Sequence, residues 1–167
     1  MKKVVNCRNS NLESQEDAEK FITLLNCYIR DPMGGGREWS MDEGFAMVSR
    51  LRKIPTMRVI FAERNGEVVG MALCFLGFSS FGGFPLLNIH DFIVREDCRG
   101  QGIGKVLMAS LEEYARLRGC GRLTLEVRED NPAAMSLYRT SGFADCEPPM
   151  RFWRKNLKML ENCSTEE

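Results

Sequence analysis

The segment Arg99-Gly100-Gln101-Gly102-Ile103-Gly104 connects a strand-like run at residues 86–94 to a helical pattern that follows it. Where a helix begins, the first backbone N–H groups have no partner inside the helix, and the positive end of the helix dipole lies beside them. Glycine adds no Cβ atom that would keep an anion away. The segment therefore predicts a strand-loop-helix unit whose main-chain amides bind phosphate. A tight turn that requires positive φ explains the glycines alone about as well.

Two other phosphate-binding motifs do not match this loop. A dinucleotide fingerprint that starts at Gly100 requires a last glycine where the chain has Lys105. A P-loop that ends at Gly104 requires an earlier glycine and a later serine or threonine, but the chain has Arg99 and Val106 at those positions. Both motifs are excluded.

The residues after the loop predict a helix, a strand and a second helix. Gly119 ends the first helical pattern, and Leu123, Leu125 and Val127 then alternate with polar residues as in a strand. Residues 131–141 have the pattern of a short helix. The order strand, helix, strand, helix is therefore expected on this side of the loop.

The residues before the loop predict a hairpin. Residues 57–64 and 68–78 are strand-like runs, and Asn65-Gly66 between them is a strong signal for a two-residue turn. The sheet is therefore expected to start with antiparallel pairing, and residues 86–94 are a third strand-like run.

The first 50 residues predict a strand at residues 2–8 and two amphipathic helices. Ser14 with Asp17, and Ser40 with Glu43, have the spacing of residues that cap a helix N-terminus. Pro32 and three glycines separate the two helices, and this connection is either a mobile lid or a plain linker. Residues 151–157 are expected to add a last strand. The whole chain, residues 1–167, then forms one domain of α/β (α+β) class, a mixed sheet with helices on its faces.

Composition narrows the class of protein. The 167 residues are 44% hydrophobic and 28% charged, as in one soluble globular domain. Lys+Arg and Asp+Glu number 23 each, so neither nucleic acid nor an anionic membrane is an expected partner. Seven cysteines without a C-x-x-C pair, no apolar membrane span and no secretory signal indicate a cytoplasmic protein. With one histidine, no metal site is expected.

Three blocks of sequence, in order and in register, resemble the GNAT superfamily of N-acetyltransferases. The first block is the strand at residues 89–94. The second is the loop, in which Arg99, Gly102 and Gly104 occupy the defined positions of the pattern Gln/Arg-x-x-Gly-x-Gly/Ala. The third is residues 131–138 with Ser141-Gly142-Phe143. The resemblance covers about residues 57–157 and is nearest to the diamine acetyltransferase-like branch.

The resemblance implies a fold and a cofactor site. The fold is a GNAT-like mixed, mostly antiparallel central sheet with helices on both faces and a splayed strand at the cofactor site. The cosubstrate is acetyl-CoA, whose pantetheine arm pairs with the splayed strand and whose pyrophosphate meets the loop. The implied cofactor-binding residues are Phe92, Ile93, Val94, Arg99, Gly100, Gln101, Gly102, Ile103, Gly104, Lys105 and Asn131. Asn131 is also a suitable N-cap before Pro132.

The resemblance also implies that Tyr138 protonates the departing thiolate. A phenol with a pKa of ~10 is protonated at neutral pH and is able to donate. The alternative role for Tyr138 is a half-buried core residue.

The proton acceptor is predicted less directly. A free alkylamine is protonated at pH 7, and removing that proton costs on the order of 4 kcal/mol. His90, the only histidine, lies on the strand beside the expected acetyl position and is the candidate base or substrate contact. The alternatives are an outward-facing structural residue and a packed ring with a fixed tautomer. Neighbouring strand residues face opposite sides, so His90 and Asp91 share a cleft only if a bulge intervenes, as the resemblance implies. The diamine branch has glutamate where this chain has His90.

The expected reaction is direct transfer of an acetyl group to a primary amine, without an acyl-enzyme, because Cys98 and Cys120 lack a partner base. Asp31, Asp91 and Glu126 are the tentative acceptor-binding carboxylates. A small diamine- or polyamine-like acceptor is favoured, and a peptide or protein amino group, an aminoglycoside, or a non-catalytic acyl-CoA-binding module are the alternatives. Family analogy implies a homodimer.

Overall fold

The computed structural model describes residues 4–157 of the chain. Its strands are β1 (Val5–Asn9), β2 (Met57–Arg64), β3 (Glu67–Ser79), β4 (Phe84–Val94) and β5 (Arg122–Leu125). Its helices are α1 (Gln15–Arg30), α2 (Met41–Arg52), the 3-10 turn η1 (Glu96–Cys98), α3 (Ile103–Leu117) and α4 (Pro132–Thr140). The strands form one sheet in the order β1-β2-β3-β4-β5, antiparallel except for the parallel pair β4-β5.

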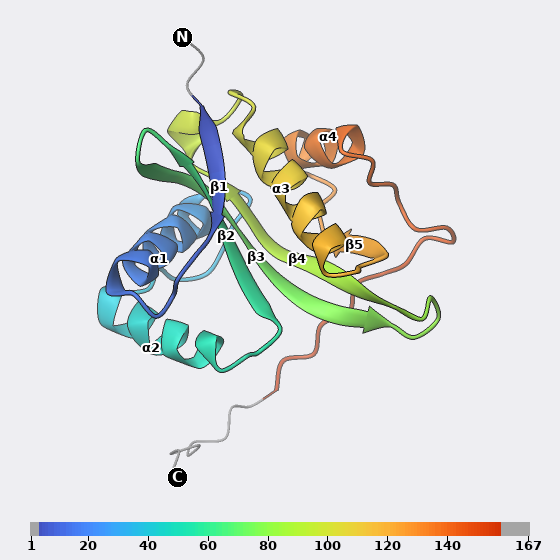
Figure 1. Ribbon diagram of the computed structural model, residues 1–167, viewed down its shortest axis with the longest axis horizontal. Helices are drawn as coiled ribbons and strands as arrows, with labels where there is room; N and C mark the ends of the chain where they lie inside the picture. Colours follow the sequence, from blue (N-terminus) through green and yellow to red (C-terminus); the bar gives the residue numbers. More distant parts are fainter. Residues whose placement is uncertain (1–3, 158–167) are drawn as a thin grey trace.

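Helices cover both faces of this sheet (Figure 1). On one face, α1 and α2 pack on a core that includes Phe21, Phe61 and Met71. On the other face, α3 packs on a second core with Leu87 and Leu107, and α4 joins it through Tyr138. The predicted fold class, a mostly antiparallel mixed sheet between helices, is confirmed.

Local signals account for the element boundaries. The Ser14 side chain caps α1 by accepting a hydrogen bond from the amide of Asp17, and Ser40 forms a reciprocal capping box with Glu43 at α2. The β2-β3 turn has Asn65 and Gly66 at φ of 55° and 82°, the conformation that an Asn-Gly hairpin turn requires.

Three boundary predictions need correction. Residues 151–157 contain no strand, so the predicted last strand is wrong. Within residues 4–157 the segment pairs with no strand, and Phe152 and Trp153 are exposed. The first strand is Val5–Asn9, and the part of its predicted range at residues 2–3 lies outside the described residues. β5 ends at Leu125, so Val127 does not belong to it.

None of the helices in the described part of the chain combines the length and the apolar character that crossing a membrane requires.

Candidate functional site

The loop before α3 presents unused backbone donors. Gly100 and Gly102 have φ of 71° and 83°, in the left-handed region that favours glycine, and Gly102 is the N-cap of α3. No backbone amide of residues 100–104 donates a hydrogen bond to another described residue. Five N–H groups at the positive end of a 15-residue helix are therefore unpaired, which is the arrangement in which helix N-termini bind anions.

Gly104 is required for close packing rather than for a positive φ, unlike Gly100 and Gly102. A Cβ atom on Gly104 would lie 3.0 Å from Leu137 Cδ2 and 3.7 Å from Phe92 Cε1. Gly104 therefore lets the first turn of α3 approach α4 and β4 closely, which brings the loop, the strand and the last helix together.

β4 contains a bulge at His90. Asp91 is opposite Leu73 and Ile89 is opposite the next residue, Cys74, so His90 is the extra residue. Ile89 lies in the α3-side core, whereas Leu73, the partner of Asp91, lies in the α1/α2-side core. The His90 ring packs edge-on against the Phe75 ring, with 5.6 Å between the ring centroids, and Phe75 packs against the same α1/α2-side core. The bulge thus puts His90 and Asp91 on one face, as the sequence analysis required.

β4 separates from β5 just beyond this point. The parallel pairing runs only from Leu86, opposite Arg122, to Ile89, opposite Leu125. Asn88 Nδ2 donates to Thr124 Oγ1 at 3.2 Å near the end of the paired region. After the unpaired His90, residues 91–94 pair with β3 alone, and their other edge faces the opening between β4 and β5.

Tyr138 approaches this opening from α4. Its ring packs edge-on against the Phe92 ring and at a tilt against the Phe143 ring, with 6.0 Å and 5.9 Å between the ring centroids. The residue is 9% exposed. Burial, and secondarily the nearby Tyr28, raise the pKa of Tyr138 to about 12. The phenol therefore remains protonated throughout the neutral range.

Tyr28 and Asp91 approach the opening from the α1/α2 side. Burial raises the pKa of Asp91, and the charge of His90 opposes that shift in the pKa. Burial, then Asp91 and Asp31, raise the pKa of Tyr28. Because Tyr28 also acts on the pKa of Tyr138, the opening brings together groups from both faces of the sheet.

Arg99 connects the loop to α1. Its Nη1 forms an ion pair with Asp31 at 2.7 Å, and its Nε donates to the Val94 carbonyl at 3.0 Å. Asp31 also accepts a hydrogen bond from the Met33 amide, and this bond, followed by Arg99, holds the pKa of Asp31 below its ordinary value. Asp31 therefore anchors the loop in this structure, and its 10% exposed side chain leaves little surface for an acceptor.

The other predicted residues are distributed around the loop and the opening. Asn131 caps α4 by accepting a hydrogen bond from the Ala134 amide at 3.1 Å. Gln101 and Lys105 are exposed at the loop, and the Gln101 side chain bonds to Arg64 and to the Asp97 carbonyl. Ile103 is buried, so only its backbone is offered to a ligand. Glu126 is exposed beyond the end of β5 and is not brought into the group around Asp91.

Sequence reasoning missed Tyr28 and the ion pair between Arg99 and Asp31. Tyr28 fits the apolar spacing of its helix, so no pattern distinguishes it from a core residue. The ion pair joins positions 68 residues apart, and no local signal reports it.

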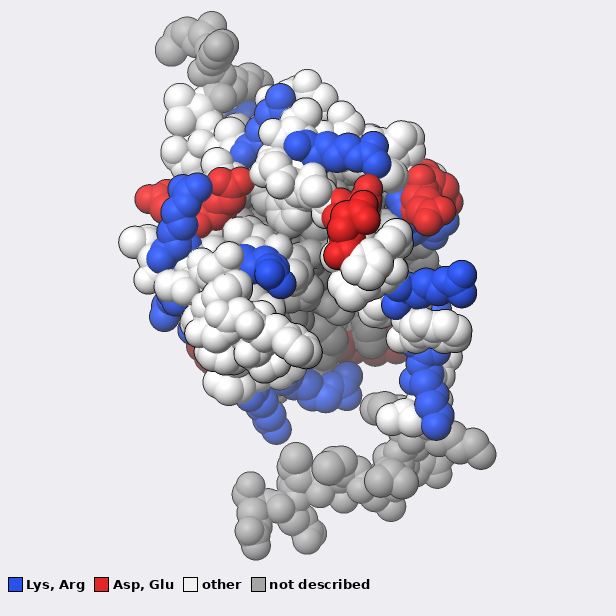
Figure 2. Space-filling model, turned by 90° about the vertical axis from the view of Figure 1, so that its right-hand side faces the viewer, with Lys and Arg blue, Asp and Glu red and all other residues white. Residues whose placement is uncertain are grey.

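The face that carries α4 has charges of both signs. Figure 2 shows Lys and Arg side chains interspersed with Asp and Glu, without a continuous field of one sign. Electrostatic preference at the opening therefore comes from individual groups such as Asp91 rather than from the face as a whole.

Comparison with known proteins gives a family. Residues 22–143 match the family described as the acetyltransferase (GNAT) family. The chain is 48% identical to streptothricin acetyltransferase of Streptomyces lavendulae over an aligned stretch of 82 residues. This stretch covers 49% of this chain and 41% of that protein. It is 36% identical over 78 residues to thialysine N-epsilon-acetyltransferase of Bos taurus, covering 47% of this chain and 45% of that protein. The chain thus matches less than half the length of these two relatives.

A solved structure supports the fold. An aminoglycoside N-acetyltransferase in complex with CoA superposes with a TM-score of 0.71 over 93% of this chain and 97% of that chain, at 17% sequence identity. At this identity the likeness concerns the fold alone.

Proposed function

Because the chain belongs to the acetyltransferase (GNAT) family, we propose that it transfers the acetyl group of acetyl-CoA directly to a primary amine of a small molecule. One observation carries the proposal: the loop with unused amides, the free edge of β4 and the protonated Tyr138 all meet at the opening between β4 and β5. An anion site, a backbone edge and a proton donor are what an acyl-CoA substrate and its leaving thiolate require.

The residues present fit acetyl-CoA, which supplies a thioester as the acetyl donor. The amides of residues 100–104 hold the pyrophosphate, and Lys105 adds positive charge beside it. The backbone edge of Phe92, Ile93 and Val94 that faces away from β3 pairs with the pantetheine arm, apart from the Val94 carbonyl, which accepts a hydrogen bond from Arg99. Arg99 contributes to the same site from its ion pair with Asp31, and Asn131 lies at the start of α4.

Proton removal from the acceptor is assigned to the bulged part of β4. His90 and Asp91 share the α1/α2 face, and the burial that raises the pKa of Asp91 makes its carboxylate a stronger proton acceptor than an exposed one. His90 relays the proton to solvent or accepts it itself. The neutral amine then attacks the thioester carbonyl, whose developing negative charge a β4 amide stabilises.

Tyr138 assists departure of the thiolate. Since its pKa is about 12, it donates a hydrogen bond to the developing thiolate, and full proton transfer is favoured only as far as burial also raises the pKa of that sulfur. Direct transfer without an acyl-enzyme is also consistent with the low reactivity of Cys98. Burial raises the pKa of the Cys98 thiol, so it is a poor nucleophile at neutral pH.

The acceptor class rests on the carboxylate at the opening and on the relatives. Asp91 is the carboxylate best placed to bind a cationic amine, with Tyr28 beside it. The named acceptors of the two relatives, streptothricin and the N-epsilon nitrogen of thialysine, favour a small-molecule amine. An aminoglycoside or an amino group on a peptide is the second candidate, and a diamine is the first to test.

We also propose a cytoplasmic homodimer. Phe78, Phe81, Phe152 and Trp153 are 65%, 107%, 72% and 81% exposed, which is unusual for large aromatic side chains of a monomer and fits burial against a second copy. The six described cysteines are free thiols, as expected in a reducing compartment.

An amine panel tests the activity. Release of CoA thiol from acetyl-CoA is measured with diamines, lysine analogues, an aminoglycoside and a peptide with a free N-terminus. Acceleration by a small amine supports the proposal. Saturable CoA binding without thiol release from any amine indicates a non-catalytic acyl-CoA-binding module, and a lack of any thermal shift with CoA contradicts both.

A further inference from the structure

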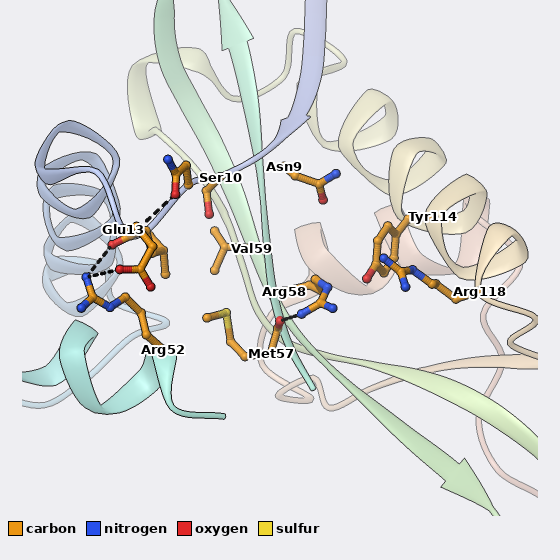
Figure 3. A pocket seen from close by; sticks show the side chains of 11 residues that line it. Asn9, Ser10, Glu13, Arg52, Met57, Arg58, Val59, Tyr114 and Arg118 are labelled. Atoms are coloured by element: carbon orange, nitrogen blue, oxygen red, sulfur yellow. Dashed lines mark hydrogen bonds and ion pairs between the residues drawn. The ribbon is translucent and has the colours of Figure 1, made fainter. Parts of the chain in front are cut away.

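A second pocket lies at the opposite end of α3 from the loop at residues 99–104 (Figure 3). Its volume is about 340 Å³. It is formed by the end of β1, the turn that follows, the start of β2 and the last turns of α2 and α3. Its lining residues of interest here are Asn9, Glu13, Arg52, Arg58, Tyr114 and Arg118. Because α3 has 15 residues with a rise of about 1.5 Å each, the pocket is roughly 20 Å from the loop.

The lining is rich in arginine. Three arginines face one carboxylate, and that carboxylate, Glu13, is already paired with Arg52 at 3.2 Å. Arg58 donates to the Pro55 carbonyl at 3.2 Å, and Arg118 lies over the Tyr114 ring, with 5.3 Å from its Cζ to the ring centroid. Within residues 4–157, neither Arg58 nor Arg118 has a carboxylate partner. The pocket therefore carries two positive charges that no acidic group offsets.

Tyr114 supplies an independent observation. Its hydroxyl is buried, with essentially no exposed surface, and has no hydrogen-bond partner among the described residues. A buried hydroxyl without a partner is unfavourable by about 1–3 kcal/mol, so such groups are uncommon unless a ligand or another polar group completes them. Figure 3 shows Arg58, Tyr114 and Arg118 on the same side of the pocket, with Asn9 nearby.

We propose that this pocket binds a small oxyanion, a phosphate or carboxylate group, at a site separate from that for acetyl-CoA. The guanidinium groups of Arg58 and Arg118 donate to its oxygens, and such charge-assisted hydrogen bonds are the stronger ones. The Tyr114 hydroxyl, which is covered in this structure, donates as well once the side chains over it move toward the anion. A cation is disfavoured by the charges, and an apolar ligand leaves the hydroxyl unpaired. The negative end of the α3 dipole opposes the anion, and the cationic Arg118, the helix C-cap, offsets it.

The test must separate this pocket from the loop, which also attracts phosphate. Calorimetric titration with inorganic phosphate is therefore done on the full chain saturated with CoA, in a buffer without oxyanions. We expect saturable binding that persists in the presence of CoA, and roughly tenfold or greater loss of phosphate affinity in Arg58→Gln and in Arg118→Gln.

Arg116→Gln is the matched control. Arg116 lies on the last turn of α3, pairs with Glu112 at 3.4 Å and does not line the pocket, so its removal is expected to leave phosphate affinity unchanged.

Tyr114→Phe gives a readout that a purely structural hydroxyl would not. Without phosphate, this variant is expected to be as stable as the wild type or more so, since it removes an unpaired polar group. With phosphate, its thermal shift is expected to be smaller than that of the wild type. A parallel titration with succinate distinguishes the sources: tighter binding of phosphate indicates a phosphate ligand, and tighter binding of succinate a carboxylate. Absence of saturable binding of either anion in the CoA-saturated wild type, or full affinity in Arg118→Gln or Tyr114→Phe, overturns the proposal.

Discussion

The two halves of β4 belong to one strand but have different neighbours. From Leu86 to Ile89 the strand is paired on both edges, with β3 and with β5. After the His90 bulge, from Asp91 to Val94, it is paired with β3 only. Side chains in both halves are largely apolar, so hydrophobicity does not distinguish them. The difference shows that loss of a neighbouring strand, together with one extra residue, leaves a backbone edge of β4 unpaired, and this is the edge that we propose binds the pantetheine arm.

The largest expected effect concerns stability and belongs to the paired half. Leu87 is fully buried in the α3-side core. Leu87→Ala is expected to lower the free energy of unfolding by about 2–5 kcal/mol, because it removes apolar contacts and leaves a cavity. Urea unfolding measures this change. Below the unfolding transition, kcat is expected to stay within about twofold of the wild type; a tenfold loss in folded protein would mean that the paired half also takes part in the chemistry.

The next effect concerns the open half and the chemical step. Tyr138→Phe is expected to reduce kcat by about 100-fold, because it removes the donor to the thiolate. Affinity for CoA and the melting temperature are expected to be nearly unchanged, since the ring and its contacts with Phe92 and Phe143 remain. Steady-state kinetics and calorimetry test the two together. An unchanged kcat would assign the donor role to water.

A smaller effect on rate is expected at Asp91. Asp91→Asn is expected to lower kcat/KM at neutral pH about tenfold, within the range of general base catalysis when His90 remains. Because the pKa of Asp91 is raised, kcat/KM of the wild type is expected to increase as the pH rises through that raised value. The variant is expected to lack this limb of the profile. Retention of the full profile in Asp91→Asn would leave His90 as the base.

The same raised pKa has a consequence for stability. The native carboxyl holds its proton more tightly than the unfolded chain does, so the stabilisation is complete below the unfolded pKa of ~3.9 and is lost as pH rises through the folded pKa. Asp91→Asn is therefore expected to gain stability relative to the wild type between pH 4 and pH 8. Melting temperatures at the two pH values test the sign, and an equal difference at both would contradict burial as the cause.

The smallest effect is expected at the loop. Gly102→Ala is expected to strain the backbone by about 1–2 kcal/mol, because φ is 83°. Part of that strain is expected to turn the amides and weaken CoA binding by about threefold to tenfold. Gly119→Ala is the matched control: φ is 68° at the other end of α3, and an added Cβ likewise meets no atom within 4 Å. Both variants should lose similar stability, and only Gly102→Ala should lose CoA affinity.

Local signals predicted most of the architecture because they act over a few residues. The caps at Ser14 and Ser40, the Asn65-Gly66 turn and the glycine-rich loop each encode a boundary in their own chemistry. The prediction of a strand at residues 151–157 failed for the opposite reason. A strand requires a partner strand, and the residues of the segment itself do not say whether it pairs with one.

The candidate site was predicted unevenly. The loop followed from its glycines and its place before a helix, whereas Tyr138 and the bulge next to Asp91 followed from the resemblance to the GNAT superfamily. The position of Asp31 did not, because its ion pair with Arg99 depends on how α1 packs against β4. Tyr28 has the same spacing as the apolar residues of its helix, so the sequence does not single it out. Glu126 was a candidate that is exposed beyond the end of β5.

The amino-acid sequence by itself determined the fold class, the loop and the kind of ligand that its amides attract, because these depend on residue spacing and on backbone chemistry. Only the tertiary structure decided where β5 stops, which face His90 and Asp91 share, and which charges are already paired. Those features arise from contacts between distant segments, and it is burial and proximity in the folded chain that set the proton affinities at the opening between β4 and β5.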